Sequence, residues 1–217
     1  MLNRRHLLGS AAAVAGLTAT GLAARADEPH DTFVYDPLDP VPTVGGKTLM
    51  PSIMTAGIED QGAVEDRPDV LCYTTPALET PVVVHGPVAV ELWAASSAPD
   101  TDFTAKLVDV AADGTAHNLA DGIVRGRYRD SLRQRSAPLE PAVPTLFRID
   151  LWDLAHTFLP GHCIRLEISS SNFPRFDRNT NTGNELGRDG ASDVVAATQQ
   201  VFHHVGHASA LVLPVAE

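Results

Sequence analysis

Apolar and polar residues alternate in short runs along most of the chain after residue 70. Residues 87–96 carry apolar side chains at every second position, and Glu91 and Trp93 fall on the opposite face. Residues 146–152 and 163–169 alternate in the same way, with charged residues between the apolar ones. This two-residue period predicts β-strands with one buried face. The residues expected to point inward are Val88, Val90, Leu92, Ala94, Phe147, Ile149, Leu151, Ile164, Leu166 and Ile168.

Further strand-like runs complete an all-β pattern, and no long run with a helical period follows residue 26. The dipeptide Asp113-Gly114 predicts a hairpin turn. Short strands without helices predict a two-sheet antiparallel jelly-roll sandwich of galactose-binding-like architecture, in which each sheet has one face in water. The additional strands are expected at residues 102–110, 122–130, 199–205 and 210–215.

The N-terminal segment, residues 1–26, has the features of an export signal. Arg4 and Arg5 precede a weakly apolar stretch that ends in Ala24-Arg25-Ala26, a small-x-small cleavage site. Paired arginines of this kind resemble the bacterial twin-arginine signal. An uncleaved membrane anchor is the alternative, but the stretch is shorter than the roughly 20 residues that span a bilayer. We therefore expect an exported protein, periplasmic or extracellular, without stable membrane association after cleavage.

The mature chain is expected to have two parts. Residues 27–69 are rich in Pro, Asp and Gly and show little periodicity, which predicts an extended linker or docking segment. Residues 70–217 contain the predicted strands and form the sandwich domain.

Charge and cysteine content narrow the classes of function. The net charge of −11 and the pI near 5.1 argue against a nucleic-acid partner, which needs a basic face. Cys72 and Cys163 could pair outside the cytoplasm, but each lies in a strand-like run, which favours two buried thiols. The sequence has no Cys-x-x-Cys or Cys/His cluster. We expect neither a cofactor nor a metal.

The sequence has few candidates for catalysis. The Gly-x-Ser-x-Gly motif of a nucleophile elbow is absent, and Ser209, preceded by His207, opens a strand rather than a strand-turn-helix unit. His203 and His207 would share one face of a continuous strand and could hold a metal, but zinc sites need three or four ligands. Histidines that cap the last strand are the simpler interpretation, and His156 and His162 also look structural.

Two charged groups have both a binding and a structural interpretation. Asp100 and Asp102 could bind calcium, although no dense acidic loop surrounds them, and turn formation explains them more simply. Alternation from residue 122 to 130 would place Arg125, Arg127 and Arg129 on one face. This row could bind an anion or could pair with acids of a neighbouring strand, for which Glu91 and Asp109 are candidates.

Four stretches of the chain together have the pattern of one known module. They are residues 65–110, 113–131, 158–183, with the sequence ISSSNFPRFDRNTNTG at 168–183, and 211–215. These stretches resemble the C-terminal domain of the serine hydrolases of the X-Pro dipeptidyl-peptidase and cocaine-esterase type. Cys163, where a basic residue is usual, and His156, where an asparagine is common, depart from that pattern.

The resemblance implies a jelly roll that packs beside an α/β-hydrolase domain, which carries the Ser-Asp-His triad, and that lends only wall residues to the acyl pocket. Leu49 and Met50 are the positions that would approach the substrate, and a hydrophobic plug against the sandwich edge is the alternative for them. No catalytic residue is expected in this chain. The residues expected to close the sandwich or dock onto the catalytic domain are Phe173, Arg175, Phe176 and Asp177.

Two hypotheses of function follow. The first is a stand-alone accessory domain of such a hydrolase, which has dipeptidyl-peptidase or esterase activity only with an α/β-hydrolase catalytic domain in trans. The second is a secreted galactose-binding-like module that binds carbohydrate or protein. Fold-level analogy supports the second only weakly, and sugar platforms need exposed aromatic residues, of which Trp93 and Trp152 are the tryptophan candidates.

Overall fold

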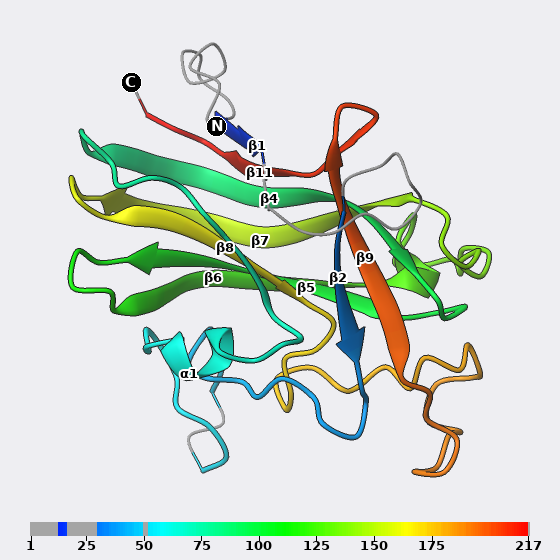
Figure 1. Ribbon diagram of the computed structural model, residues 1–217. Coiled ribbons are helices and arrows are strands. Elements are labelled where there is room, and N and C mark those ends of the chain that lie inside the picture. The colour runs from blue at the N-terminus through cyan, green and yellow to red at the C-terminus, as the bar shows by residue number, and fades with distance from the viewer. Residues whose placement is uncertain (1–12, 17–29, 50–51, 217) are drawn as a thin grey trace.

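Two antiparallel β-sheets form the protein (Figure 1). The computed structural model describes residues 13–16, 30–49 and 52–216. Pairing and core packing are those of a β-sandwich, as the alternation predicts. The strands are β1 (Ala13–Gly16), β2 (His30–Tyr35), β3 (Leu71–Thr74), β4 (Val82–Ser96), β5 (Asp102–Val110), β6 (Ala116–Arg125), β7 (Thr145–Phe158), β8 (Cys163–Ser169), β9 (Ala197–His204), β10 (His207–Ala208) and β11 (Ala210–Leu213).

The larger sheet has seven strands built around the long strand β4. Its order is β1-β11-β4-β9-β10, with β2 paired to β9 and β7 paired to β4. In Figure 1, β2 and β9 run steeply across the direction of the other strands. β4 and β7 pair over nearly their whole length, with one register shift between Val88 and Ala89, which face Trp152 and Asp150. The extra residue between these two, Leu151, makes a β-bulge.

The hydrophobic core lies between this sheet and the four-stranded sheet, which has the order β3-β8-β5-β6. All ten residues that the alternation places inward are buried in the structure, which confirms that part of the prediction. Phe103 and Phe147, from opposite sheets, meet with ring centroids 4.8 Å apart. Aromatic and aliphatic side chains of both sheets therefore interdigitate as in other sandwiches.

The outer face of the four-stranded sheet is buried over β5 and the second half of β8, although Cys72 and Thr74 of β3 are exposed. This burial corrects the expectation that each sheet has one wet face. Every residue of β5 is buried, including Lys106, and so is Glu167 of β8, which alternation places outward. A second layer of chain covers this part of the face, formed by the described residues of 41–49 and 52–70 and by the loop after β8. Period-two alternation distinguishes the two faces of a strand, but it does not tell whether water or more protein lies against the polar face.

Residues 27–69 contain regular structure that their composition does not predict. His30–Tyr35 form strand β2, paired along its length with β9, and Gly62–Glu65 form the short helix α1. Figure 1 places α1 beside the four-stranded sheet. The Gln61 side chain accepts a hydrogen bond from the Lys106 ammonium at 2.9 Å, and an ion pair joins Glu65 to Arg165. Polar contacts between α1 and the sheet therefore hold this segment in place.

The predicted arginine row does not lie on one strand. β6 ends at Arg125, and Gly126–Tyr128 form a 3-10 helix, whose tighter turn rotates the following side chains out of the strand period. The neighbouring acids are not Glu91 or Asp109. Glu91 pairs with Arg148, and Asp109 binds both His156 and His162.

Both cysteines are free in the structure. Cys72 is exposed and Cys163 is half-buried, so the interpretation as two buried thiols is wrong. Cys72 lies on β3, which is at the edge of the four-stranded sheet among the strands that the structure describes.

The predicted signal peptide lies mostly outside the described residues. Of residues 1–26, only Ala13–Gly16 are described, and they pair with β11 at the end of the larger sheet. Among residues 13–16, 30–49 and 52–216, no helix is both long and apolar enough to cross a membrane.

Candidate docking face

The loop after β8 is tied to the N-terminal segment by backbone hydrogen bonds. Phe173 N–H donates to the carbonyl of Val41 at 2.9 Å, and Thr43 N–H donates to the carbonyl of Phe173 at 2.7 Å. The Ser171 hydroxyl accepts a hydrogen bond from the Val41 N–H at 2.9 Å. The loop and the segment 41–43 therefore form one layer over the end of the four-stranded sheet.

Buried ion pairs hold the arginines at the end of β6. The Arg125 guanidinium donates two hydrogen bonds to Asp102, at 2.9 and 2.8 Å, and reaches Asp177 of the loop at 3.0 Å. Arg127 bonds to Asp100 at 2.7 Å, with both side chains almost fully buried. Asp100 and Asp102 thus bind arginines in place of calcium. The Arg125–Asp102 pair is bidentate, the strongest arrangement for this kind of pair. Asp100 accepts one bond from the Arg127 guanidinium and one, at 2.7 Å, from the backbone N–H of Arg127.

The electrostatics of this group favour charged arginine. Burial works against the charge on Arg125, but the hydrogen bonds and charge of Asp102, joined by those of Asp177, outweigh it and raise the pKa of Arg125 above its ordinary value. Asn179, itself buried, donates to both Asp100 and Asp102 at 3.0 and 2.8 Å. The carboxylates therefore have their remaining acceptor sites occupied, as buried charges require.

Arg175 connects the same loop to β6 and to the segment around Gly46. Its guanidinium lies 3.0 Å from the Asp121 carboxylate. A Cβ atom at Gly46 would lie 3.4 Å from the Arg175 guanidinium, and the φ of Gly46 is +90°, so glycine suits this close approach. Burial of Asp121 raises the pKa of its carboxyl, and the charge of Arg175 opposes that shift.

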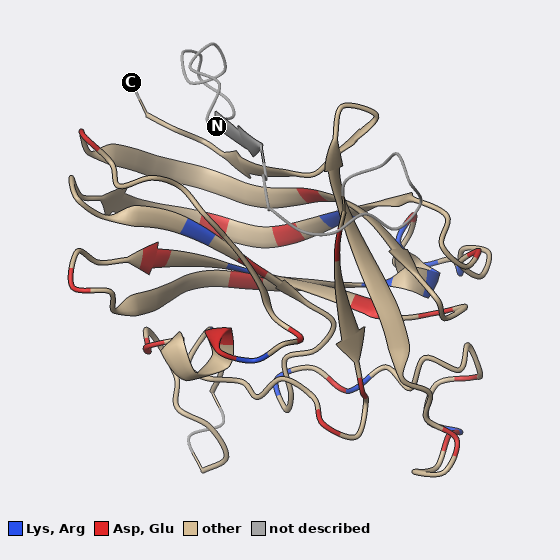
Figure 2. Ribbon diagram, in the orientation of Figure 1, with Lys and Arg blue, Asp and Glu red and all other residues tan. Residues whose placement is uncertain are grey.

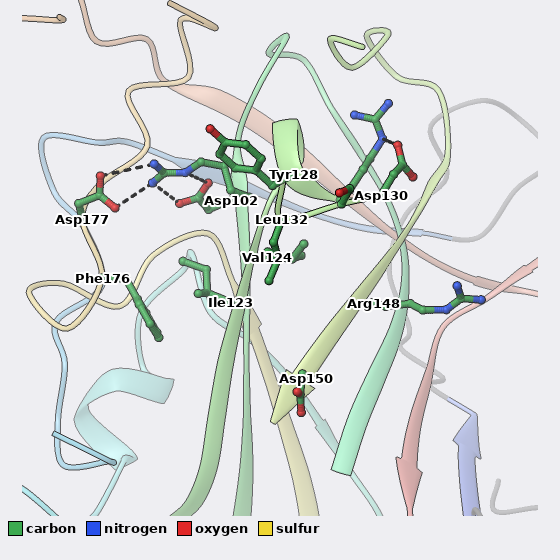
Figure 3. A pocket seen from close by; sticks show the side chains of 13 residues that line it. Asp102, Ile123, Val124, Tyr128, Asp130, Leu132, Arg148, Asp150, Phe176 and Asp177 are labelled. Carbon is green, nitrogen blue, oxygen red and sulfur yellow. Dashed lines mark hydrogen bonds and ion pairs between the residues drawn. The ribbon is translucent and has the colours of Figure 1, made fainter. Parts of the chain in front are cut away.

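A pocket of about 560 Å³ lies on the same side of the molecule. Figure 3 shows its wall on β6 and β7, with the loop residues Phe176 and Asp177 on one flank. Its volume falls in the range of about 300–1,000 Å³ found for ligand and side-chain sites. Its apolar lining includes Ile123, Val124, Tyr128, Leu132 and Phe176, and its charged lining includes Arg129, Asp130, Arg148, Asp150 and Asp177.

An exposed aromatic residue stands beside this pocket. Trp152 follows Leu151 on β7, and 65% of its surface is exposed. The backbone N–H of Trp152 donates a hydrogen bond to the carboxylate of Asp150, a pocket residue, at 2.7 Å. The Lys47 ammonium lies 5.9 Å from the centre of the indole ring and 3.4 Å from the carbonyl oxygen of Leu151. Lys47 and Trp152 therefore meet at the edge where β7 faces the N-terminal segment.

The structure brings most of the candidate site residues to this side of the molecule. Arg175, Phe176 and Asp177 meet β6 there, and Leu49, 95% exposed, follows Lys47 by two residues. Phe173 is partly exposed, with the Arg178 guanidinium 5.6 Å from its ring centre. Met50 lies outside the described residues. The roles assigned to these residues stay predictions. We define the docking face as Lys47, Leu49, Trp152 and the pocket next to them.

Sequence reasoning missed Lys47, Trp152 and the pocket. Lys47 was hidden in a segment without periodicity. Trp152 appeared only as a possible sugar platform, although the alternation that buries Leu151 places it on the outer face. Its positive φ and the bulge at Leu151 have no signal in the alternation.

The remaining candidates for chemistry have structural contacts. The Ser209 hydroxyl donates to the carbonyl of Phe202 at 2.6 Å and accepts from the Trp93 N–H at 2.9 Å. His203 and His207 do not share a strand, because β9 ends at His204 and β10 begins at His207. His203 lies 3.5 Å from the Asp31 carboxylate. In the described part of the chain, no group of three or more His, Cys, Asp or Glu residues could hold a metal ion.

Figure 2 shows that acidic and basic positions interleave over the sheets and loops. Much of this charge is used within the molecule, in the pairs described above. The docking face is mixed in the same way, with lysine and arginine next to aspartate around an apolar centre.

Comparisons with known proteins give a consistent picture. Residues 3–212 match the model of the X-Pro dipeptidyl-peptidase C-terminal non-catalytic domain, and this match extends into the predicted signal peptide. The chain is 46% identical over 188 residues to a cocaine esterase from Rhodococcus sp., covering 87% of this chain and 32% of that protein.

Two solved structures are similar over a comparable length. An α-amino acid ester hydrolase is 32% identical with a TM-score of 0.80, over 89% of this chain and 33% of that one. An aminopeptidase from the marine sediment archaeon Thaumarchaeota archaeon is 31% identical with a TM-score of 0.79, over 88% and 34%. The chain thus spans about a third of the length of these relatives. It belongs to the family of X-Pro dipeptidyl-peptidase C-terminal non-catalytic domains.

Proposed function

We propose that this protein is the accessory sandwich of an α/β-type serine hydrolase and that it can serve a catalytic domain in trans. The catalytic domain supplies the nucleophile, base and acid, while this chain supplies a rigid surface against which that domain packs. The observation that carries the proposal is the match to a non-catalytic domain over nearly the whole chain. The relatives with a similar domain are named as an esterase, an ester hydrolase and an aminopeptidase.

The contacts of Ser209 support the division of labour. A serine nucleophile needs a hydrogen-bonded base and an accessible oxygen. Ser209 is buried, and its hydroxyl links the carbonyl of Phe202 to the N–H of Trp93. This geometry joins β9 and β4 and makes Ser209 a structural residue.

A reconstitution experiment tests the proposal. The Rhodococcus cocaine esterase is prepared without the third that matches this chain, and ester hydrolysis is followed with p-nitrophenyl acetate. We expect this chain alone to give no turnover and its addition to prolong the half-life of activity of the truncated esterase. Bovine serum albumin at equal concentration controls for unspecific stabilisation. A half-life that this chain leaves unchanged, or saturable turnover by this chain alone, contradicts the proposal.

We also propose that the protein is exported through the paired arginines of its N-terminal segment. Arg4 and Arg5 precede the apolar stretch and the small-x-small site, which is the order that an export signal requires. The test is fractionation of bacterial cells that express the chain with or without the double substitution Arg4→Lys and Arg5→Lys. We expect the unchanged protein in the periplasm or medium and the variant in the cytoplasm; equal distribution of both contradicts export by this route.

A further inference from the structure

We propose that the docking face is where the sandwich contacts the hydrolase catalytic domain, with Trp152 as the anchor of that contact. This inference rests on the proposed function and adds to it the location of the interface and its main residue. Four observations carry it: the backbone of Trp152, its exposure, its polar supports and the pocket beside it.

The backbone of Trp152 has an unfavourable conformation. Its φ is +72°, in the left-handed region, which bulky residues other than glycine rarely adopt. Such a conformation costs on the order of 1–3 kcal/mol and persists only where the surroundings enforce it. Strained residues of this kind cluster at binding sites. Since most of the indole is exposed, burial within this chain offsets little of that cost.

Two polar contacts fix the strained residue. The Asp150 carboxylate accepts a hydrogen bond from the backbone N–H of Trp152. The Lys47 ammonium approaches both the indole ring and the carbonyl of Leu151. The indole is thus presented outward by an ordered bulge. A preorganised aromatic side chain loses little conformational entropy on binding, which is one reason why tryptophan is enriched among residues that dominate interface energies.

The pocket and the segment of Lys47 both carry exposed apolar residues. Leu49, two residues after Lys47, and Leu132 are 95% and 90% exposed, and Leu132 shares the pocket with Ile123 and Phe176. Asp150 belongs both to the pocket and to the support of Trp152. An apolar centre with a charged rim is the usual composition of a protein interface.

The length of the relatives identifies the occupant. The matched family is a C-terminal non-catalytic domain, and about two thirds of the Rhodococcus esterase lies outside its match to this chain. That larger part must meet this domain on some surface. Since the matched family is a C-terminal domain, the larger part precedes it in the relatives, and Lys47 and Leu49 belong to the N-terminal segment of this domain.

Binding of the full chain to the truncated esterase, measured by isothermal titration calorimetry, tests the anchor. Trp152→Asn removes the indole, and asparagine tolerates a positive φ, so the fold is retained. We expect the Kd to rise by at least tenfold, about 1.4 kcal/mol. Val205→Ala is the matched control, because Val205 is fully exposed in the turn between β9 and β10, and its Kd should stay within twofold.

The outcomes separate this inference from the proposed function. If the unchanged chain does not bind the truncated esterase, the proposed function fails and this inference fails with it. If the chain binds and Trp152→Asn binds equally well, the proposed function holds and the anchor is wrong. Self-association that Trp152→Asn abolishes, seen by sedimentation of the chain alone, would assign the face to a second copy and also overturn this inference.

A second measurement avoids any dependence on the folding of a truncated partner. Residues 30–217 of this chain replace the matched part of the intact esterase, and esterase activity and a cooperative thermal unfolding transition confirm a folded chimera. We expect Trp152→Asn in the chimera to shorten the half-life of esterase activity, while Val205→Ala leaves it unchanged. Equal half-lives of all three proteins contradict the anchor role.

Discussion

The two sheets of this protein use the same alternation of residues but differ in what lies against their outer faces. On the larger sheet, Glu91 of β4 and Arg148 of β7 face outward and form an exposed ion pair at 3.4 Å. On the smaller sheet, Lys106 of β5 and Glu167 of β8 also face away from the core, yet they are buried under the segment 41–70 at 3.3 Å from each other.

This difference shows that polar residues have two distinct uses in one fold. On the larger sheet the polar residues make the outer face hydrophilic, and each exposed ion pair contributes little to the free energy of unfolding. Under the covering layer, charges have lost their hydration and depend on their partners, so loss of one partner is costly. The pairs that fasten the loop after β8, Arg125 with Asp102 and Arg127 with Asp100, belong to the second kind.

The largest expected effect is that of Asp100→Ala. This change leaves the Arg127 guanidinium buried without its carboxylate and removes acceptors from the Arg127 N–H and from Asn179. Breaking a buried pair in this way costs about 3–5 kcal/mol of unfolding free energy. Urea unfolding measures it, and a loss below about 1 kcal/mol would show that the buried pairs behave like exposed ones.

The next effect concerns pH. Burial, opposed by Lys106 and reinforced by Glu65, raises the pKa of Glu167 from its ordinary 4.5 to about 7. Between these two values the native protein holds a proton that the unfolded chain releases. The contribution of Glu167 to the free energy of unfolding is therefore complete below pH 4.5 and is lost as the pH rises through 7. In the unchanged protein this effect lowers the free energy of unfolding by about 3 kcal/mol between pH 4.5 and 8, and Glu167→Gln should remove that decline.

Thermal and urea unfolding of the two proteins across this pH range give the test. At each pH the free energy of unfolding of Glu167→Gln is subtracted from that of the unchanged protein, because all other groups titrate in both proteins. Glu91→Gln on the exposed sheet is the control and should keep the slope of the unchanged protein. Parallel curves for Glu167→Gln and the unchanged protein would contradict a raised pKa at this position.

A smaller effect is expected where the two sheets approach each other. A Cβ atom at Gly122 of β6 would lie 2.1 Å from the carbonyl oxygen of Asp150 on β7, so Gly122→Ala forces these backbones apart. Overpacking of this kind costs about 1–3 kcal/mol. Gly62→Ala in α1 is the control, since its nearest atom lies at 3.6 Å. Equal stability of both variants would mean that the sheets separate there without cost.

The smallest effect is that of Glu91→Ala, which removes the exposed pair with Arg148. Both side chains are about half exposed or more, at 48% and 74%, and such pairs contribute about 0.2–1 kcal/mol. Urea unfolding measures this loss, which should shrink further in high salt because salt screens exposed charges. A loss as large as that of Asp100→Ala would remove the distinction between the two sheets.

Alternation was sufficient to predict the fold class and the core. Every second residue from Val88 to Ala94, from Phe147 to Leu151 and from Ile164 to Ile168 is buried as the period requires, because the inner face of each strand meets the other sheet. The jelly-roll connectivity and the galactose-binding-like architecture stay predictions. The burial of Lys106 and Glu167 could not be predicted, since the chain that covers them is distant in sequence and shows no period of its own.

The candidate site was predictable only in part. The resemblance pointed to Leu49 and to the loop of Phe173 to Asp177, because those stretches are similar to the family's sequence. The position of Trp152 depends on a bulge opposite Val88 and Ala89 and on Lys47, which is 105 residues away along the chain. Neither contact leaves a local pattern, so only the folded chain brings the anchor and its supports together.

Hydrogen–deuterium exchange of the full chain, alone and with the truncated esterase, tests the central claim most directly. If the sandwich serves a catalytic domain through the docking face, binding should slow exchange in residues 45–49 and 148–153 and leave the turn between β9 and β10, around residues 203–208, unchanged. Slowed exchange confined to segments other than residues 45–49 and 148–153, or no change anywhere in the described residues, would contradict this account.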